Sequence, residues 1–261
     1  MRVHVGTSGY SYKEWKGSFY PEKIRPDAML AYYASRLGAV EINNTFYRMP
    51  KAEVLAAWAA EVPGRFSFVL KAPGSITHRK QLEPGGPILR AFCEAAQAMG
   101  PKLGAFLLQL PPFLEKDVAM LDAFLAALAK LPNAPPRVAL EFRNGSWLVD
   151  QDGAVGAMLH RHGAALCLAE SDDASAPLDL GARLGSTADW GYLRLRRTDY
   201  TDDELTAWVA RLRAQKWKEV YVFLKHEDEG KGPAFATKLR ALTLSSTRTR
   251  AKRDGGASDA R

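Results

Sequence analysis

The segment Val138-Ala139-Leu140-Glu141-Phe142-Arg143 is an apolar, strand-like run that ends on charged side chains. A strand buried on both faces is expected to be apolar throughout, so polar residues at its end need a reason. Six further runs end on a charged or amide side chain in the same way: Val40-Glu41-Ile42-Asn43, Phe68-Val69-Leu70-Lys71, Phe106-Leu107-Leu108-Gln109, Leu166-Cys167-Leu168-Ala169-Glu170, Tyr192-Leu193-Arg194-Leu195-Arg196 and Val222-Phe223-Leu224-Lys225. An opening run, Val3-His4-Val5-Gly6, makes the eighth. We therefore expect all the strand ends to open onto one shared, partly wet cavity.

Helical patterns lie between these runs. Thr201-Asp202-Asp203-Glu204 is a capping box, and apolar residues follow it at helical spacing. The same periodicity appears in the stretches 29–37, 54–62, 88–99, 121–131, 155–162 and 235–242. After Glu170 the pattern is weakest, and only 178–184 offers a short helix there.

A strand followed by a helix, repeated about eight times, is typical of a parallel sheet, and the length matches a single (β/α)8 TIM barrel. The alternative is a doubly wound open sheet, which usually carries a glycine-rich phosphate loop after its first strand. Gly6-Thr7-Ser8-Gly9 meets that pattern only in part, and about 20 residues separate it from the helix start at Pro26-Asp27. The sequence therefore favours the barrel.

The bulk composition is that of an ordinary globular protein, with 47% hydrophobic and 25% charged residues. No apolar run approaches the length of a membrane span, and a strand at Val3 leaves no room for a signal peptide. Cys93 and Cys167 fall in a helical and a strand pattern, so we expect two reduced core cysteines. These features predict a cytoplasmic protein without membrane association.

The carboxyl-terminal segment differs from the rest. Residues 245–261 carry five basic and two acidic side chains, which gives +3 of the total charge of +7. They include no apolar residue larger than alanine, so the segment is predicted to be a disordered basic tail after a barrel domain at 1–244. A weak nucleic-acid arm is the alternative.

Side-chain alternation along the strands selects candidates for catalysis. Ala139, Glu141 and Arg143 share one face of their strand, and the small Ala139 suits a crowded barrel interior. By the same parity Glu41 points inward, so Glu41 and Glu141 are predicted to face each other at the barrel mouth as an acid/base pair. The structural alternative is that each carboxylate is ion-paired to a neighbouring cation and only solves the problem of a buried strand end.

The remaining candidates are cations, amides and rings near the same ends. Lys71, Arg143 and Arg194 are predicted to clamp an anion, and Gln109, Asn43 and Tyr47 to orient the substrate. His78, Trp147 and Lys225 extend this substrate-binding set. The first loop holds many rings, between Tyr10 and Tyr20, which either bind a ligand or pack as a lid.

Metal ligands are scarce in this sequence. His160 and His162 face different sides of a helix, and no HExxH or cysteine-rich spacing supports His78 or His226 as a ligand. A Gly-x-Ser-x-Gly elbow is also absent. We expect no metal and no cofactor.

Several short motifs occur along the chain in a fixed order: Gly6-Thr7-Ser8-Gly9-Tyr10, Phe19-Tyr20-Pro21, Val40-Glu41-Ile42-Asn43-Asn44-Thr45-Phe46-Tyr47, Lys71-Ala72, Thr77-His78, Gln109-Leu110-Pro111-Pro112, Glu141-Phe142-Arg143-Asn144-Gly145-Ser146-Trp147 and Tyr221-Val222-Phe223-Leu224. Together they resemble the YecE-like family, which is catalogued as a domain of unknown function with a TIM-barrel fold. The resemblance covers roughly Val3 to Leu242. It implies a barrel shaped like those of sugar isomerases and apurinic endonucleases, and hence phosphate or nucleic-acid ligands. Arg196 replaces a histidine, and Lys225-His226 an asparagine pair, of the commoner family pattern.

These observations leave three hypotheses for the function of the protein. The first is a metal-independent acid/base enzyme, a hydrolase or isomerase, that acts on a small anionic or phosphorylated substrate at the carboxyl-terminal face of the barrel. The second is a barrel that binds a nucleotide or nucleic acid with little or no catalysis. The third is a sensing or scaffold protein whose polar ring serves stability alone. The sequence leaves the oligomeric state open.

Overall fold

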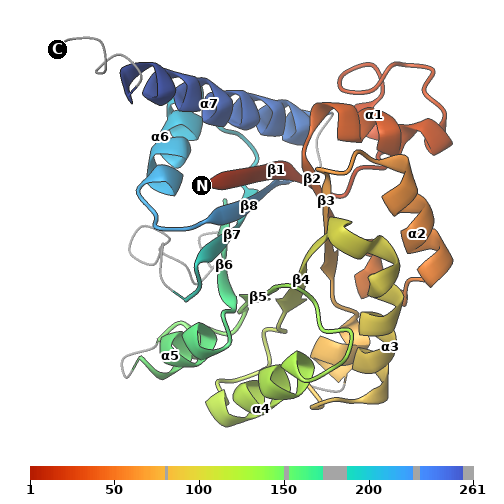
Figure 1. The fold of residues 1–261 in the computed structure, drawn as a ribbon, viewed down its shortest axis with the longest axis vertical. Coiled ribbons are helices and arrows are strands. Elements are labelled where there is room, and N and C mark those ends of the chain that lie inside the picture. The colour runs from red at the N-terminus through yellow and green to blue at the C-terminus, as the bar shows by residue number, and fades with distance from the viewer. Residues whose placement is uncertain (80–81, 150–152, 173–186, 226–229, 255–261) are drawn as a thin grey trace.

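Eight parallel strands form a closed barrel with the helices around it (Figure 1). The computed structural model describes residues 1–79, 82–149, 153–172, 187–225 and 230–254. The strands are β1 Arg2–Ser8, β2 Ala39–Ile42, β3 Ser67–Lys71, β4 Leu103–Gln109, β5 Val138–Glu141, β6 Ala165–Ser171, β7 Trp190–Arg196 and β8 Glu219–Leu224. Pairing of β1 with β8 closes the ring, so the predicted barrel is confirmed and the open sheet is wrong.

Seven α-helices lie within the described residues. They are α1 Met29–Arg36, α2 Ala52–Glu61, α3 Pro87–Ala96, α4 Val118–Ala129, α5 Ala154–Arg161, α6 Asp202–Arg213 and α7 Lys231–Asp254. The capping box at the start of α6 forms as predicted, with Thr201 and Glu204 each bonding the other's backbone N–H. The short helix expected at 178–184 lies outside the described residues. None of the described helices combines the length and apolar character needed to cross a membrane.

The predicted boundary between barrel and tail at residue 244 falls inside α7. The backbone of this helix continues to Asp254, and residues 255–261 are outside the described part of the chain. The division at 244 and the disordered tail over 245–261 stay predictions.

The barrel interior is filled unevenly around its circumference. Small and aliphatic side chains enter from β2 to β6, and aromatic rings enter from β7 and β8. Tyr192 and Phe223 meet there with ring centroids 5.4 Å apart. Cys167 also faces this interior, and it and Cys93 are free and buried, as expected from the sequence.

The rings of the first loop form a core of their own. Trp15 and Tyr20 are buried, and the indole of Trp15 lies 4.8 Å from the Tyr12 ring and 5.8 Å from Phe19. Tyr20 also donates a hydrogen bond to the Tyr10 carbonyl oxygen. These contacts favour the packed-lid interpretation of the loop over ligand stacking.

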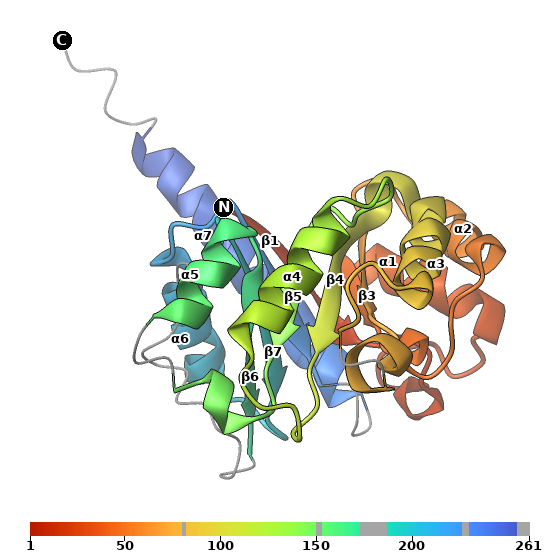
Figure 2. The same cartoon turned by 90° about the horizontal axis from the view of Figure 1, so that it is seen from below.

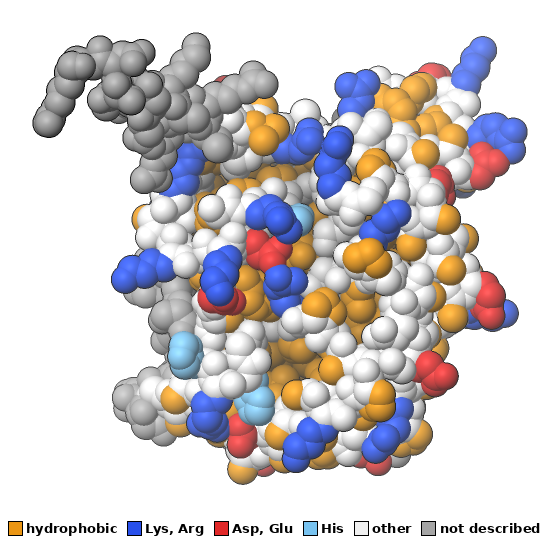
Figure 3. Space-filling model, in the orientation of Figure 1, with side chains coloured by type: hydrophobic (Ala, Val, Ile, Leu, Met, Phe, Trp, Pro, Cys, Tyr) orange, Lys and Arg blue, Asp and Glu red, His pale blue; other side chains and the backbone are white. Residues whose placement is uncertain are grey.

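Opposite ends of the barrel differ in chemistry. In Figure 2 the strands run downward from the end beside the N terminus. At that amino-terminal end Glu219 pairs with His4 at 3.0 Å and with Arg137, and His4 stacks on Tyr221 at 4.6 Å. Figure 3 shows this face, with basic side chains gathered around an acidic group and a histidine. The ion-paired side chains line a hollow of about 430 Å³ at this end of the barrel, the end that in such barrels serves stability.

The close approach of β1 and β2 gives a test of the barrel geometry. A Cβ at Gly6 would collide with the carbonyl oxygen of Ala39 on β2, whereas a Cβ at Gly38 would meet nothing within 4 Å. We expect Gly6→Ala to lower the free energy of unfolding by about 1–3 kcal/mol, because backbone must move to admit the methyl group. Gly38→Ala is the matched control and should change it by less than about 1 kcal/mol. Urea unfolding measures both, and equal stabilities would contradict the closed β1–β2 contact.

Candidate functional site

The carboxyl-terminal ends of β2, β3, β4, β5 and β7 bring their polar side chains to one rim. We call this set the rim: Glu41, Lys71, Gln109, Glu141, Arg143, Arg194 and Arg196. Glu141 follows Ala139, which faces the barrel interior, so the predicted side-chain parity of β5 is observed. Register agrees across strands, because Gln109 of β4 is the partner of Glu141 of β5.

Arg194 joins the two predicted catalytic carboxylates directly. Its two terminal nitrogens donate to Glu141 Oε2 at 2.6 Å and to Glu41 Oε1 at 2.8 Å. All three side chains are buried, with 5% of Arg194 exposed and at most 1% of either carboxylate. A buried guanidinium between two carboxylates is held by charge-assisted hydrogen bonds on both sides.

The carboxylate of Glu41 is further satisfied by neutral donors. Tyr192 Oη donates to its Oε2 at 2.6 Å, and Ser8 Oγ and Asn43 Nδ2 donate to Oε1 at 2.8 and 3.1 Å. Together with Arg194, these donors occupy both oxygens. Glu41 is therefore a fixed anchor rather than an exposed base.

Glu141 lies between two guanidinium groups. Besides Arg194, Arg143 Nε approaches its Oε1 at 2.6 Å, without the alignment of a hydrogen bond. Burial acts to raise the pKa of Glu141, but the charges of Arg194 and Arg143 outweigh burial and lower it to about 2. The carboxylate is thus ionised at neutral pH and is a weak base.

Lys71 has a different environment from the arginines. Its Nζ donates to Gln109 Oε1 at 2.9 Å and lies 4.1 Å from the centroid of the Phe46 ring. Within the described residues no carboxylate pairs with it, since Glu41 and Glu141 bind arginines instead. Burial, followed by the positive charge of Arg194, lowers the pKa of Lys71 to about 8.

The rim carries more positive than negative charge. Four cations, Lys71, Arg143, Arg194 and Arg196, lie there with only two carboxylates, Glu41 and Glu141. Arg143 is 35% exposed, and the side chain of Arg196 makes no hydrogen bond or ion pair within the part of the chain that the structure describes. These two guanidinium groups are placed to receive an anion from solvent.

Two further predicted residues lie next to this rim. Asn43 joins it through Glu41. The His78 ring packs edge-on against Phe46 at 5.0 Å, and its Nδ1 contacts Thr77 Oγ1 at 2.8 Å. Burial and the nearby Lys71 lower the pKa of His78, so the ring is neutral at pH 7.

The structure does not bring Trp147 or Tyr47 to the rim. Trp147 is buried against Phe142, at 4.7 Å, and its Nε1 donates to the Leu114 carbonyl oxygen. Phe142 has the opposite parity to Glu141, which explains why its partner lies outside the barrel. Tyr47 is 85% exposed and touches the outer side of Phe46. Lys225 follows β8 and borders a hollow with Arg197 and Tyr200.

Sequence reasoning missed three residues that contact rim side chains: Ser8, Tyr192 and Phe46. Tyr192 precedes Arg194 by two residues, so strand alternation alone points it inward. Ser8 ends β1, two residues beyond the predicted strand. Phe46 ends the short helix η3, Asn44–Phe46, and had no periodic signal in the sequence.

The described residues contain no group of three or more His, Cys, Asp or Glu side chains that could hold a metal ion. His226 lies outside them. The metal-free, cofactor-free site stays a prediction.

A closed (β/α)8 barrel with a charged rim at its carboxyl-terminal mouth defines the class of protein. The chain belongs to the family described as "Protein of unknown function DUF72", whose sequence model matches residues 4–256. This confirms the YecE-like resemblance.

Named relatives extend the comparison. UPF0759 protein YecE of Escherichia coli (strain K12) is 28% identical over 128 residues, which are 48% of this chain and 44% of that protein. UPF0759 protein YunF of Bacillus subtilis (strain 168) is 29% identical over 154 residues, which are 56% and 52% of the two chains. The match therefore spans about half the length of these curated relatives.

Solved structures agree with the fold. A DUF72 family protein from Thermotoga maritima MSB8 superposes with a TM-score of 0.77 at 25% identity, covering 94% of this chain and all of that one. A second, from Enterococcus faecalis V583, gives a TM-score of 0.74 at 20% identity over 93% and 98% of the chains, and shows the fold alone.

The Arg194 bridge gives a stability prediction. We expect Arg194→Met to lower the free energy of unfolding at pH 7 by about 3–5 kcal/mol, because it leaves two buried carboxylates without their shared cation. Arg196→Met is the matched control: it removes a rim cation that has no partner among the described residues, and should cost less than about 1 kcal/mol.

The free energy of unfolding should also depend differently on pH in the wild-type protein and in Arg194→Met. The pKa of Glu141, lowered from 4.5 to about 2, contributes stability above pH 4.5 that is lost as pH falls toward 2. Without Arg194, burial dominates and raises the pKa of Glu141, so the folded variant takes up a proton as the pH falls. The loss of stability of Arg194→Met relative to the wild-type protein should therefore become smaller between pH 7 and pH 4. Urea unfolding at several pH values measures this, and a deficit independent of pH would contradict the bridge.

Proposed function

We propose that the protein is an enzyme that binds a small anionic substrate, phosphorylated or carboxylated, at the rim, and that Lys71 transfers the proton. The observation that supports this is that the two rim carboxylates bind Arg194 and leave other rim cations without an anionic partner. Arg194 takes both buried carboxylates, while Lys71 and Arg196 keep their donors without an anionic partner in the described residues.

The guanidinium groups suit the anion. Arg143 and Arg196 lie on β5 and β7 sides of the mouth, half-buried and able to offer paired N–H donors to phosphate or carboxylate. Partial burial strengthens such contacts because less water screens them. Arg194 is buried beneath these two groups, stays bound to Glu41 and Glu141, and adds to the positive potential at the mouth.

Proton transfer is assigned to Lys71 rather than to the carboxylates. A pKa of about 8 lies near the working pH, where a general acid or base is most effective. Glu141 is ionised and paired, and Glu41 is saturated, so we assign both to positioning Arg194. A partly neutral amine beside fixed cations suits abstraction of a proton from carbon or activation of water, the steps of isomerases and hydrolases. The two free, buried cysteines fit a cytoplasmic location for this chemistry.

An anionic aldehyde tests both parts of the proposal. Pyridoxal phosphate forms an imine with a neutral amine, and borohydride fixes the adduct for mass spectrometry. At pH 7.4 a lysine with a pKa near 8 is about 20% neutral, whereas one at 10.5 is about 0.1% neutral. We expect Lys71 to be labelled well ahead of the exposed Lys218, whose pKa is raised by Asp189, and inorganic phosphate to protect it.

The control is Arg143→Ala, which should keep the label but weaken protection by phosphate. Lys71→Arg should remove the label from that position and leave the fold intact. Labelling of Lys71 at the rate of exposed lysines would remove its acid/base role, and labelling that phosphate does not slow would remove the anion site.

Nucleotide or nucleic-acid binding remains a second candidate function. A specific observation favours it: a cavity outside the rim combines the unpaired cations Arg48 and Lys51 with the Trp58 ring.

A further inference from the structure

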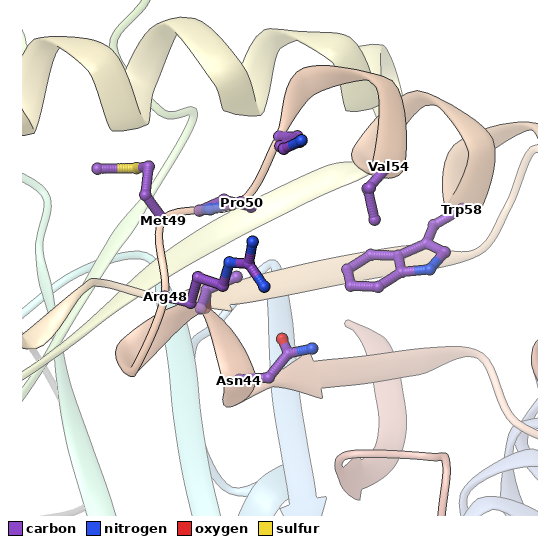
Figure 4. A pocket seen from close by; sticks show the side chains of 8 residues that line it. Asn44, Arg48, Met49, Pro50, Val54 and Trp58 are labelled. Atoms are coloured by element: carbon purple, nitrogen blue, oxygen red, sulfur yellow. The ribbon is translucent and has the colours of Figure 1, made fainter.

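A cavity of about 390 Å³ lies between the segment after β2 and helix α2 (Figure 4). Its labelled lining residues are Asn44, Arg48, Met49, Pro50, Val54 and Trp58. Lys51 and Thr45 complete the lining, and none of the rim side chains contributes to it. The volume falls within the range of about 300–1,000 Å³ that is usual for small-molecule sites.

One wall of the cavity is aromatic and held in place. Trp58 and Val54 are four residues apart on α2 and therefore lie on the same side of the helix. Tyr10 packs edge-on against the Trp58 ring, with centroids 6.4 Å apart. The indole is only partly buried, so it offers a preformed surface on which a planar ring can stack.

Another wall is positively charged. Arg48 and Lys51 make no side-chain hydrogen bond or ion pair within residues that the structure describes, and both line the cavity. Lys51 is also the N-cap of α2, where no side chain caps the first amide groups. Two free cations beside an uncapped helix start favour an anionic group, phosphate above all.

A neutral polar group completes the lining. The amide of Asn44 faces the same space as Arg48 and Trp58 (Figure 4), and has no hydrogen-bond partner of its own in the described part of the chain. Asparagine both donates and accepts, as the edge of a nucleobase requires of its partner.

We propose that this cavity binds a mononucleotide, with the base stacked on Trp58, its edge on Asn44 and its phosphate on Arg48 and Lys51. A ligand with a planar ring, a polar edge and a phosphate uses every unpartnered group in the lining. An inorganic anion would leave Trp58 unused, and a neutral aromatic would leave two cations unused. This inference goes beyond the rim chemistry and depends on none of its residues.

The cavity and the rim are neighbours but separate sites. The short helix η3, Asn44–Phe46, lies between them. Phe46 faces Lys71 on the rim side, and Thr45 Oγ1 donates to the Lys71 carbonyl oxygen at 2.6 Å. Arg48 and Trp58 make no hydrogen bond, ion pair or ring contact with Lys71 in the described residues, so variants at these two positions test the cavity separately from Lys71.

Titration calorimetry of the full chain with AMP tests the proposal, with adenosine and inorganic phosphate as separate probes. We expect AMP to bind more tightly than either. Trp58→Ala should weaken AMP about 5- to 150-fold, the range for loss of one base–aromatic stack, and Trp58→Phe should retain most of the affinity. Arg48→Ala should reduce affinity and remove the preference of AMP over adenosine.

The matched control is Arg25→Ala, which removes an exposed arginine paired with Asp27 and should leave AMP binding unchanged. Circular dichroism confirms the fold of each variant, and Arg48→Ala with Trp58→Phe keeps the test valid if Trp58→Ala does not fold. No AMP binding, or binding insensitive to both Trp58 and Arg48, would overturn the proposal. AMP affinity lost in Arg143→Ala instead would assign the nucleotide to the rim. Failure here leaves labelling of Lys71 untouched, so the two proposals can be separated.

Discussion

The rim depends on one buried cation, Arg194, which two glutamates from opposite sides of the barrel share. Its contacts at 2.6 and 2.8 Å tie β7 to β5 and β2 across the interior, at a depth where an unpaired charge would be costly. The same contacts decide what the other rim groups can do. Because the carboxylates are occupied, Lys71 has only a neutral amide and a ring as partners, and Arg196 has no anion within the described residues. A structural ion-pair network thereby leaves a reactive amine and free guanidinium groups at the mouth.

The fold was predictable because its signals are local and repeated. Alternating apolar runs and helical faces, eight times over, leave few arrangements, and the length selects the barrel. Closure of the barrel depends on a contact between residues far apart in the sequence. β1 pairs with β8 from Arg2 to Thr7, and no local pattern encodes that contact. Strand alternation also pointed Glu41, Glu141 and Arg194 correctly into the interior.

The partners within the site were not predictable from spacing. Which cation takes which carboxylate depends on side-chain reach across the barrel, so Glu41 and Glu141 appeared as an acid/base pair when Arg194 in fact bridges them. Trp147 followed a rim motif yet packs against Phe142, whose parity is opposite to that of Glu141 and which therefore lies outside the barrel. The cavity between Arg48 and Trp58 could not be predicted from the sequence for a related reason. In the sequence Trp58 belongs to an ordinary helical apolar pattern. Only the packed structure shows that its ring is partly exposed beside two unpaired cations, Arg48 and Lys51.

The central claim is that Arg194 satisfies the carboxylates and leaves Lys71 a low-pKa amine next to an anion site. Its most direct test is an NMR titration of the full chain with ¹³Cε-labelled lysine, with Lys71→Arg used to assign the resonance. We predict a titration midpoint for Lys71 near 8 in the free protein, and a higher midpoint in phosphate, because a bound anion favours the charged amine. A midpoint at the ordinary value of 10.5, unchanged by phosphate, would contradict it.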